Sequence, residues 1–290
     1  MKFNWSGIVG TMSSSSNNNN NSNNNTPAPR RVWSDNKTVY ERNEKRRMTF
    51  VIYLGLPGCG KSYFTGLLRE AVNAAKLSSI VVGRDSFRVQ DGVYRYVPER
   101  EPMLQKAHLE VLFQLSEKRT YDVVIVDDAN LAIEQIVGTL LAIEHEDNNI
   151  VFVDFDPHYI DIHLRRLAET GHNMPRERLV NMEWAYMEAA QKLVEMGVQR
   201  VVVRSPAKDT WELDYGEFCA ESERYMQEAI GEVMEMANAQ YASSFSILSY
   251  FAHACPWLKR EIFSKYKEMV CGAIKEEKEM EEPEPKKQKN

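Results

Sequence analysis

The chain has 290 residues, of which 43% are hydrophobic and 27% are charged, so it can form one α/β domain of ordinary size with extensions. Its net charge of −6 argues against a protein that coats nucleic acid non-specifically, and its four widely spaced cysteines argue against a disulfide framework or a zinc site. The sequence contains neither the roughly 20 consecutive apolar residues of a membrane helix nor the apolar start of a signal peptide, so we expect a cytoplasmic or otherwise intracellular protein that does not contact membranes.

The first 47 residues offer almost nothing that a core can bury. Residues 13–25 are only Ser and Asn, and residues 30–47 are polar and basic. This composition predicts a disordered Asn/Ser-rich segment and then a basic arm over residues 1–47. Two interpretations of the basic part stay open: a solvated linker, or an arm that binds nucleic acid.

Short apolar runs rich in β-branched residues predict five buried strands, at residues 49–54, 79–82, 122–127, 150–154 and 199–203. Apolar residues at helical spacing lie between them and predict helices at residues 61–75, 101–118, 131–144, 159–169 and 175–196. Strands that alternate with helices predict a parallel sheet with helices on both faces. Ligands of such sheets bind beyond the carboxyl ends of the strands.

The pattern changes after residue 208, since residues 217–240 and 244–275 look helical and no further strand is evident. We therefore predict a kinase-like domain over residues 48–208, a helical extension over residues 209–275 and a charged, disordered tail over residues 276–290. The extension is expected to pack on the core or to form a small helical domain. We expect its helices to bind a protein partner or to self-associate.

The segment between the first strand and the first helix carries the most specific motif of the chain. It reads GLPGCGKS over residues 55–62 and matches G-x-x-x-x-G-K-[ST], a P-loop pattern that requires this strand–helix context. Backbone N–H groups of the loop close around phosphates, Lys61 reaches the β- and γ-phosphates, and Ser62 offers a hydroxyl to Mg²⁺. We therefore predict a P-loop kinase-like fold with ATP and Mg²⁺ as cofactors, and ATP contacts from Gly55, Pro57, Gly58, Cys59, Gly60, Lys61, Ser62 and Tyr63.

A carboxylate and an arginine follow the second predicted strand. Asp85 is expected to face the γ-phosphate, where a kinase needs a group that accepts the proton of the attacking hydroxyl. Arg88 comes one helical turn later and is suited to hold an anionic substrate. Taken alone, Asp85 is better interpreted as a helix N-cap. With the phosphate loop upstream, we favour a catalytic role.

Two acidic residues close the third predicted strand. Asp127 and Asp128 stand where carboxylates commonly hold Mg²⁺, directly or through water. Ordinary turn chemistry also explains Asp and Asn at a strand end. We predict a magnesium or substrate role for the pair, without deciding from the sequence which acid does which.

Arg165 and Arg166 follow the fourth predicted strand on a helix that Gly171 and Pro175 close. Two arginines on a helix are usually only solvated. In this position either one is suited to reach the transferred phosphoryl group from a mobile lid.

Tyr94-Arg95-Tyr96 alternates aromatic rings with a cation. The motif suits the stacking of a nucleobase. It equally suits an amphipathic strand or loop that packs its tyrosines, and the sequence does not decide between these interpretations.

Together these motifs resemble the phage-type polynucleotide 5′-kinase branch of the P-loop kinases, over about residues 48–205. Zeta-toxin-like kinases are close relatives that share the loop and Asp85. Two positions depart from the family, because Ala129 stands where it has Thr and Thr170 stands where a second lid arginine would fall. The resemblance implies catalysis by Asp85, Lys61 and Arg166, donor-phosphate binding by Arg166, acceptor binding by Arg88, Asp128 and Asn130, and metal binding by Ser62 and Asp127.

The function favoured by these residues is an ATP-dependent kinase that phosphorylates a hydroxyl, with the 5′ end of a nucleic acid as its substrate. A kinase of small molecules or nucleotide sugars, of the zeta-toxin type, is one alternative, and the acidic balance of residues 49–290 favours it. An ATP-dependent binding module that uses its C-terminal helices for a partner is the other alternative, which an intact Asp85 disfavours.

Overall fold

The computed structural model describes residues 47–90, 93–145, 147–172, 174–206, 214–238 and 247–248. The predicted disordered segment and basic arm before residue 47, the second predicted C-terminal helix beyond residue 248 and the charged tail over residues 276–290 lie outside the described residues. Within the described residues, no helix combines the length and the apolar character that crossing a membrane requires.

A five-stranded, all-parallel sheet forms the centre of the fold, as the sequence predicted. The strand order is β2-β5-β1-β6-β7. The strands are β1 (Met48–Leu54), β2 (Ser79–Val82), β5 (Val123–Val126), β6 (Asn148–Phe155) and β7 (Arg200–Val203). β1 lies in the middle and pairs with β5 on one side and β6 on the other. The chain reverses its direction of winding around β1, so the carboxyl end of β1 is a topological switch point where ligands bind.

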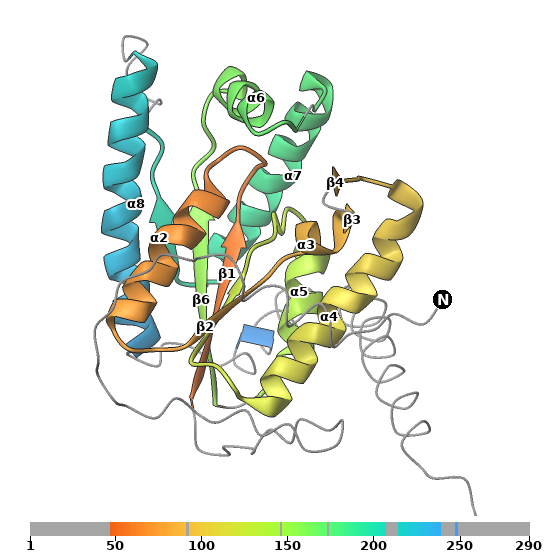
Figure 1. Cartoon of the computed structure of the whole chain (residues 1–290), viewed down its shortest axis with the longest axis vertical. Coiled ribbons are helices and arrows are strands. Elements are labelled where there is room, and N and C mark those ends of the chain that lie inside the picture. The colour runs from red at the N-terminus through yellow and green to blue at the C-terminus, as the bar shows by residue number, and fades with distance from the viewer. Residues whose placement is uncertain are drawn as a thin grey trace, which may run out of the picture. The chain divides into compact units, whose positions relative to one another are not determined.

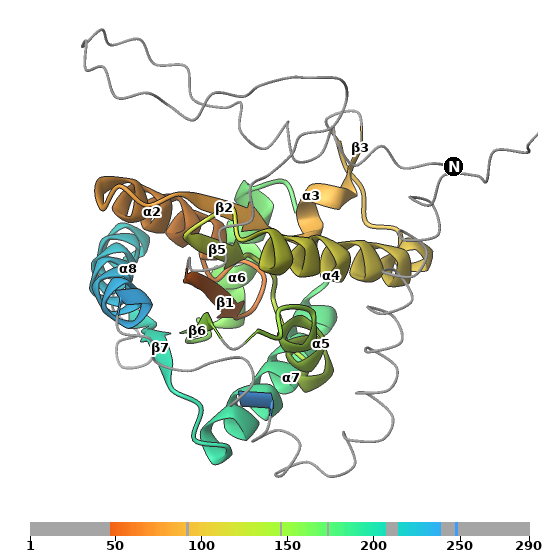
Figure 2. The ribbon, with the colours of Figure 1, turned by 90° about the horizontal axis from the view of Figure 1, so that it is seen from below.

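Helices cover both faces of this sheet, and alternate residues of β1 contact the two layers (Figures 1 and 2). Phe50 and Ile52 belong to one apolar cluster, which α4 (Glu101–Lys118), α5 (Ile133–Ala142) and α7 (Arg176–Glu195) complete. Val51 and Tyr53 belong to the other, which α2 (Lys61–Ala74) and α8 (Tyr215–Asn238) complete. β1 is therefore buried along its whole length.

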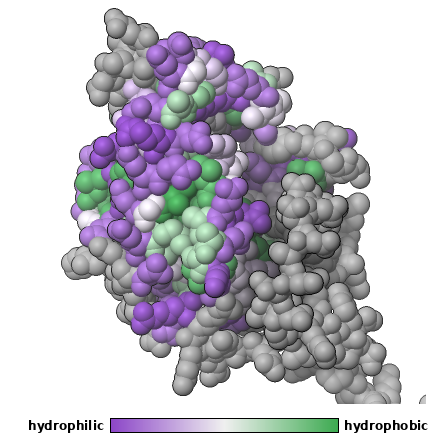
Figure 3. Space-filling view, turned by 60° about the vertical axis from the view of Figure 1, so that its left-hand side comes forward, coloured by the Kyte–Doolittle hydropathy of each residue, from purple (hydrophilic) through white to green (hydrophobic). Residues whose placement is uncertain are grey.

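Helix α8 is the described part of the predicted helical extension. It buries Phe218, Met226, Ile230 and Val233 against α2 and the strands β6 and β7. Its outer surface faces the viewer in Figure 3, where hydrophilic residues surround a smaller apolar patch. α8 thus completes one face of the sheet and shares its core with the nucleotide-loop helix α2.

Several short elements near the carboxyl edge were not predicted. Helix α3 (Arg84–Arg88) follows β2 directly, and β3 (Val89–Gln90) and β4 (Val93–Tyr94) form a small antiparallel hairpin after it. A 3-10 turn (Pro98–Arg100) leads into α4. Helix α6 (Ile160–Glu169), which the sequence predicted at residues 159–169, lies above the phosphate loop (Figure 1). The elements that were not predicted carry too few residues for a hydrophobic period to identify them.

Candidate phosphate-binding and acceptor site

The phosphate loop joins β1 to α2, and glycine is required at two of its positions. Gly58 and Gly60 have φ angles of 78° and 100°, a left-handed conformation that costs other residues energy. A Cβ on Gly58 would lie 2.8 Å from the carbonyl oxygen of His163. Gly60 is the N-cap of α2, so the N–H groups that begin this helix face the site, as phosphate binding requires.

The side chain of Lys61 folds back over the phosphate loop. Its ammonium group donates to the carbonyl oxygens of Gly55 at 3.0 Å and Leu56 at 2.8 Å. The buried thiol of Cys59 lies 3.7 Å away, and burial raises the pKa of that thiol, so it stays protonated at neutral pH. The loop therefore concentrates one positive charge beside the helix N-terminus, and contact of this charge with ATP stays a prediction.

Asp127 faces the phosphate loop from the end of β5. It accepts a hydrogen bond from Thr65 Oγ1 at 3.2 Å. Loss of solvation raises the pKa of Asp127, Lys61 and Thr65 lower it, and the nearby carboxylates of Asp128 and Asp85 raise it. The carboxylate therefore contacts α2, the helix that follows the phosphate loop, while the backbone N–H of Asp127 donates to the carbonyl of Val82 just before α3.

Oxygen donors at this point suit Mg²⁺. Ser62 is exposed in the first turn of α2, and the carboxylate of Asp127 lies beside the same helix through Thr65. The described residues contain no group of three or more His, Cys, Asp or Glu side chains that would hold a metal by itself. Proteins commonly hold Mg²⁺ through one or two oxygen ligands together with phosphate oxygens of a nucleotide, and metal binding here stays a prediction.

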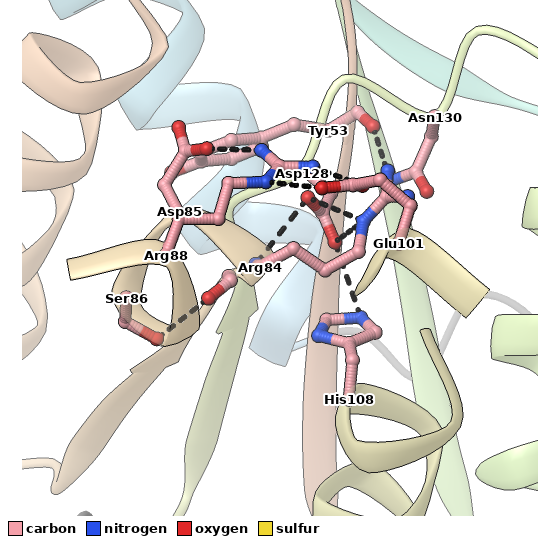
Figure 4. Close-up of polar contacts among 10 residues, drawn as sticks. Tyr53, Arg84, Asp85, Ser86, Arg88, Glu101, His108, Asp128 and Asn130 are labelled. Carbon is pink, nitrogen blue, oxygen red and sulfur yellow. Dashed lines mark hydrogen bonds and ion pairs between the residues drawn. The ribbon is translucent and has the colours of Figure 1, made fainter. Parts of the chain in front are cut away.

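Asp128 contacts Arg84 and His108, as Figure 4 shows. It is buried and pairs with Arg84 Nε of α3, at 3.1 and 3.2 Å from its two carboxylate oxygens. Nε2 of the buried His108 on α4 lies 3.3 Å from it. Burial lowers the pKa of His108, so the imidazole is neutral. The two acids that the sequence could not separate therefore face different partners.

Asn130 holds the end of β1. It has a left-handed φ of 48°, and its amide nitrogen donates to the carbonyl oxygen of Tyr53 at 2.8 Å (Figure 4). The residue is buried. Its observed role is structural, and a contact with an acceptor stays a prediction.

Asp85, Arg88 and Glu101 form a chain of charges beside Asp128 (Figure 4). Arg88 makes two bonds to Glu101, of 2.9 and 2.6 Å, and also pairs with Asp85. Asp85 is 67% exposed, whereas Arg88 is 12% exposed. The N-cap of α3 is Gly83, so the alternative interpretation of Asp85 as an N-cap is wrong, and its carboxylate is displayed to solvent.

The two lid arginines point to different places. Arg166 Nη1 donates to His158 Nε2 at 3.0 Å, and a Cβ built on Gly60 would lie 3.7 Å from the same nitrogen. Arg165 instead pairs with Glu169 at 3.1 Å and lies over the ring of Tyr215 on α8, 3.4 Å from its centre. Of the two, Arg166 is the one beside the phosphate loop.

Two buried histidines fasten the lid helix to the loop, and sequence reasoning missed both. The backbone N–H of His158 donates to His163 Nε2 at 3.0 Å, so the ring proton is on Nδ1 and bonds the carbonyl of Pro57 at 2.8 Å. Nε2 of His158 accepts from Arg166, and its Nδ1 bonds Ser205 at 2.8 Å. Both rings are therefore neutral, and they stack at 5.1 Å.

These histidines predict a pH-dependent stability. Burial lowers the pKa of His163 from 6.5 to about 4, and that of His158 well below 6.5. The unfolded chain takes up these protons first, so stability present above about pH 6.5 is lost as the pH falls toward 4. Between about pH 7 and about pH 5 we expect His163 alone to cost about 2 kcal/mol of unfolding free energy.

The unfolding free energies of wild type and of His163→Asn, measured with denaturant at both pH values, test this contribution of His163. Asn supplies a donor and an acceptor but no titrating group. The loss of unfolding free energy between the two pH values should therefore be about 2 kcal/mol smaller in the variant. Equal losses in the two proteins would contradict the assignment of a neutral, buried His163.

Helix α8 contacts the loop and the lid together. The Cβ of any residue replacing Gly60 would lie 2.6 Å from Met226 Cε. Tyr63, which we predicted to contact ATP, donates to Glu223 of α8 at 3.0 Å and is 52% exposed. Phe218 lies under Arg166, with 5.0 Å between the guanidinium carbon and the ring centre. The nucleotide contact of Tyr63 stays a prediction.

The fold and the loop define a nucleotide-binding protein with a P-loop kinase-like fold, which confirms the fold class predicted from the sequence. Residues 48–133 match the family model described as chromatin associated protein KTI12. This match spans β1 to the start of α5 and leaves the lid, β6, β7 and α8 outside it. A search of curated proteins finds no match.

Solved structures with a related arrangement are distant. A chain of the Pnkp1/Rnl/Hen1 RNA repair complex is 22% identical, with a TM-score of 0.42 over 52% of this chain and 47% of its own length. A chain of a second Pnkp1/Rnl/Hen1 complex is 24% identical, with a TM-score of 0.34 over 43% and 41%. The crystal structure of APE1195 is 14% identical, with a TM-score of 0.39 over 68% and 98%. This chain thus spans less than half of both Pnkp1/Rnl/Hen1 chains.

Proposed function

We propose that this protein is an ATP-dependent phosphotransferase that binds ATP with Mg²⁺ at residues 55–62 and phosphorylates the 5′-hydroxyl end of a polynucleotide. The observation that carries the proposal is the position of Asp127. Its carboxylate accepts a hydrogen bond from Thr65 of α2, the helix that begins at Lys61, and its backbone N–H donates to the carbonyl of Val82, two residues before α3. Asp127 therefore lies between the phosphate loop, which would bind the nucleotide, and α3, whose Asp85 would face the acceptor.

The reaction needs few protein groups. The acceptor oxygen attacks the γ-phosphorus, the bond to the β-phosphate oxygen breaks, and the hydroxyl proton passes to Asp85, whose carboxylate is exposed. Lys61 and Arg166 are cations beside the loop and offset the charge of the transferred group. Ser62 and Asp127 would hold Mg²⁺, which would neutralise phosphate charge.

A nucleic-acid acceptor is favoured by Arg88 and by Tyr96, which lies against it with 5.6 Å from the guanidinium carbon to the ring centre. Cation and ring together suit a phosphate and a base. The matched family is described as chromatin associated, and this description also supports a nucleic-acid acceptor. A small phosphorylated acceptor, as in zeta-toxin-like kinases, would use the same arginine.

An ATP-dependent binding module is a second candidate, and one observation favours it. Arg88 is engaged by Glu101 and by Asp85, so the groups that an acceptor would contact already bind each other. A protein that changes conformation with ATP but phosphorylates no substrate would not need Arg88 or Asp85 to be free for an acceptor. Such a protein would use α8, which contacts both Gly60 and the lid, to carry the nucleotide state to a partner.

One assay separates these candidates. The protein is incubated with γ-labelled ATP and a panel of 5′-hydroxyl DNA, 5′-hydroxyl RNA and small hydroxyl compounds. Label on the polynucleotide supports our proposal, and label only on small compounds supports the zeta-toxin type. Release of inorganic phosphate alone, unchanged in Asp85→Asn, would leave the binding module.

Removal of Mg²⁺ should abolish phosphoryl transfer, because the metal ion would neutralise phosphate charge and orient the transferred group in addition to the cations Lys61 and Arg166. We expect Asp127→Asn to raise the Mg²⁺ concentration for half-maximal rate by about tenfold or more. Titration of Mg²⁺ against rate measures both effects. Glu188→Gln, an exposed carboxylate on α7 that pairs with Lys192, is the matched control. Transfer that persists in excess chelator would contradict the metal assignment.

A further inference from the structure

Tyr96 is exposed on the surface between the acceptor side of the site and α7. It retains 41% of its accessible surface. Two arginines from distant parts of the chain flank its ring: Arg178 lies 4.5 Å from the ring centre and Arg88 lies 5.6 Å from it. A tyrosine that only packs into a core would not keep this exposure.

The hairpin after α3 explains the position of the ring. Val89 pairs with Tyr94, and the backbone N–H of Arg95 donates to the carbonyl of Arg88 at 3.0 Å. The chain therefore returns alongside Arg88, and Tyr96 follows at once. The ring is thus fixed next to the arginine that we assign to the acceptor.

Arg178 reaches the same ring from the first turn of α7, and it differs from the other arginines nearby. Its guanidinium is exposed, and no carboxylate among the described residues pairs with it. Arg176, in the same turn, pairs with Asp161. On α8, Arg224 stacks on Tyr225 at the same 4.5 Å, but two glutamates neutralise it. Arg178 offers an uncompensated charge beside an exposed aromatic face.

We propose that Tyr96 and Arg178 form a subsite for the nucleotide next to the reacting end of a single-stranded nucleic acid. The base stacks on the face of Tyr96 that Arg178 now covers, and the guanidinium of Arg178 moves to the adjoining phosphate. Stacking on an aromatic ring tolerates any base, and a guanidinium binds phosphate in a bidentate manner. This inference rests on the proposed function, because it places the strand so that its end meets Asp85 and Arg88.

Binding is measured first and apart from catalysis, by fluorescence anisotropy with a single-stranded 5′-hydroxyl oligonucleotide of about eight nucleotides. Tyr96→Ala and Arg178→Ala should each weaken binding roughly tenfold, and Tyr96→Phe should bind like wild type because it keeps the ring. Arg178→Ala should also reduce the slope of log affinity against log salt by about one. Tyr225→Ala and Arg176→Ala are the matched controls and should leave binding unchanged.

The kinetic readout then separates this subsite from the proposed activity. In a kinase, the two variants should raise KM for the oligonucleotide and leave the KM for ATP unchanged. Wild type that binds the oligonucleotide through Tyr96 and Arg178 but never phosphorylates it would refute the activity and keep the subsite. Phosphorylation with unchanged oligonucleotide KM in both variants would overturn the subsite, and so would a wild type that does not bind the strand.

Discussion

Replacement of Lys61 by Ala should reduce phosphoryl transfer from ATP by roughly 10³-fold, because the ammonium group is the cation of the phosphate loop. Its two bonds to the carbonyls of Gly55 and Leu56 hold it beside the N-terminus of α2. Removal of the side chain leaves the glycine conformations of the loop intact, so the fold should survive. Rates with γ-labelled ATP, together with circular dichroism of the variant, measure both expectations.

Lys192→Ala is the matched control for this variant. Lys192 lies in the last turn of α7 and pairs with Glu188 on the same helix. Because α7 leads into the amino end of β7, this lysine lies at the edge of the sheet opposite the phosphate loop. A folded Lys61→Ala protein that transfers phosphate as fast as Lys192→Ala would refute the assignment of residues 55–62 as the ATP site.

The central sheet was predictable because its strands are buried on both faces. Such strands appear in the sequence as uninterrupted apolar runs, and β1 and β5 are buried at every position. The short α3 and the β3–β4 hairpin were not predictable, since they depend on the return of the chain over Arg88 rather than on a periodic pattern. The sequence predicted helix α8, but the residues of this helix alone did not indicate that it would pack against α2.

The candidate site was predictable where one chain segment carries its chemistry. The loop, Asp85 and the Asp127–Asp128 pair stand at strand ends, where parallel topology gathers polar residues. The different orientations of Asp127 and Asp128 depend on Thr65, Arg84 and His108, which lie in other elements.

The residues of distant segments that orient the site did not belong to any recognisable sequence motif. Glu101 was visible only as an acid at the start of a predicted helix, yet it holds Arg88 through two bonds. His158 and His163 carried no motif, because a histidine acquires its role from the loop and lid atoms that surround it. The sequence therefore identified the charged residues of the site better than the contacts that orient them.

Replacement of Asp85 by Asn should lower kcat by roughly 10² or more, because the amide has nearly the same shape but cannot accept the proton of the attacking hydroxyl. Arg88 keeps its two bonds to Glu101 in the variant, so the acceptor side should retain its structure. ATP binding should be unchanged, since Asp85 pairs with Arg88 of α3, whereas Lys61 bonds to carbonyls of the phosphate loop. Steady-state rates and a separate nucleotide-binding measurement test the two halves of this expectation.

Glu188→Gln is the control for the loss of charge, because Glu188 is 69% exposed, much like Asp85 at 67%, and also belongs to an ion pair on a helix. It should leave kcat unchanged. A lower kcat in Asp85→Asn together with unchanged ATP binding would support Asp85 as the base. Unchanged transfer in Asp85→Asn would instead mean that the exposed carboxylate serves only to hold Arg88, and the kinase proposal would lose its general base.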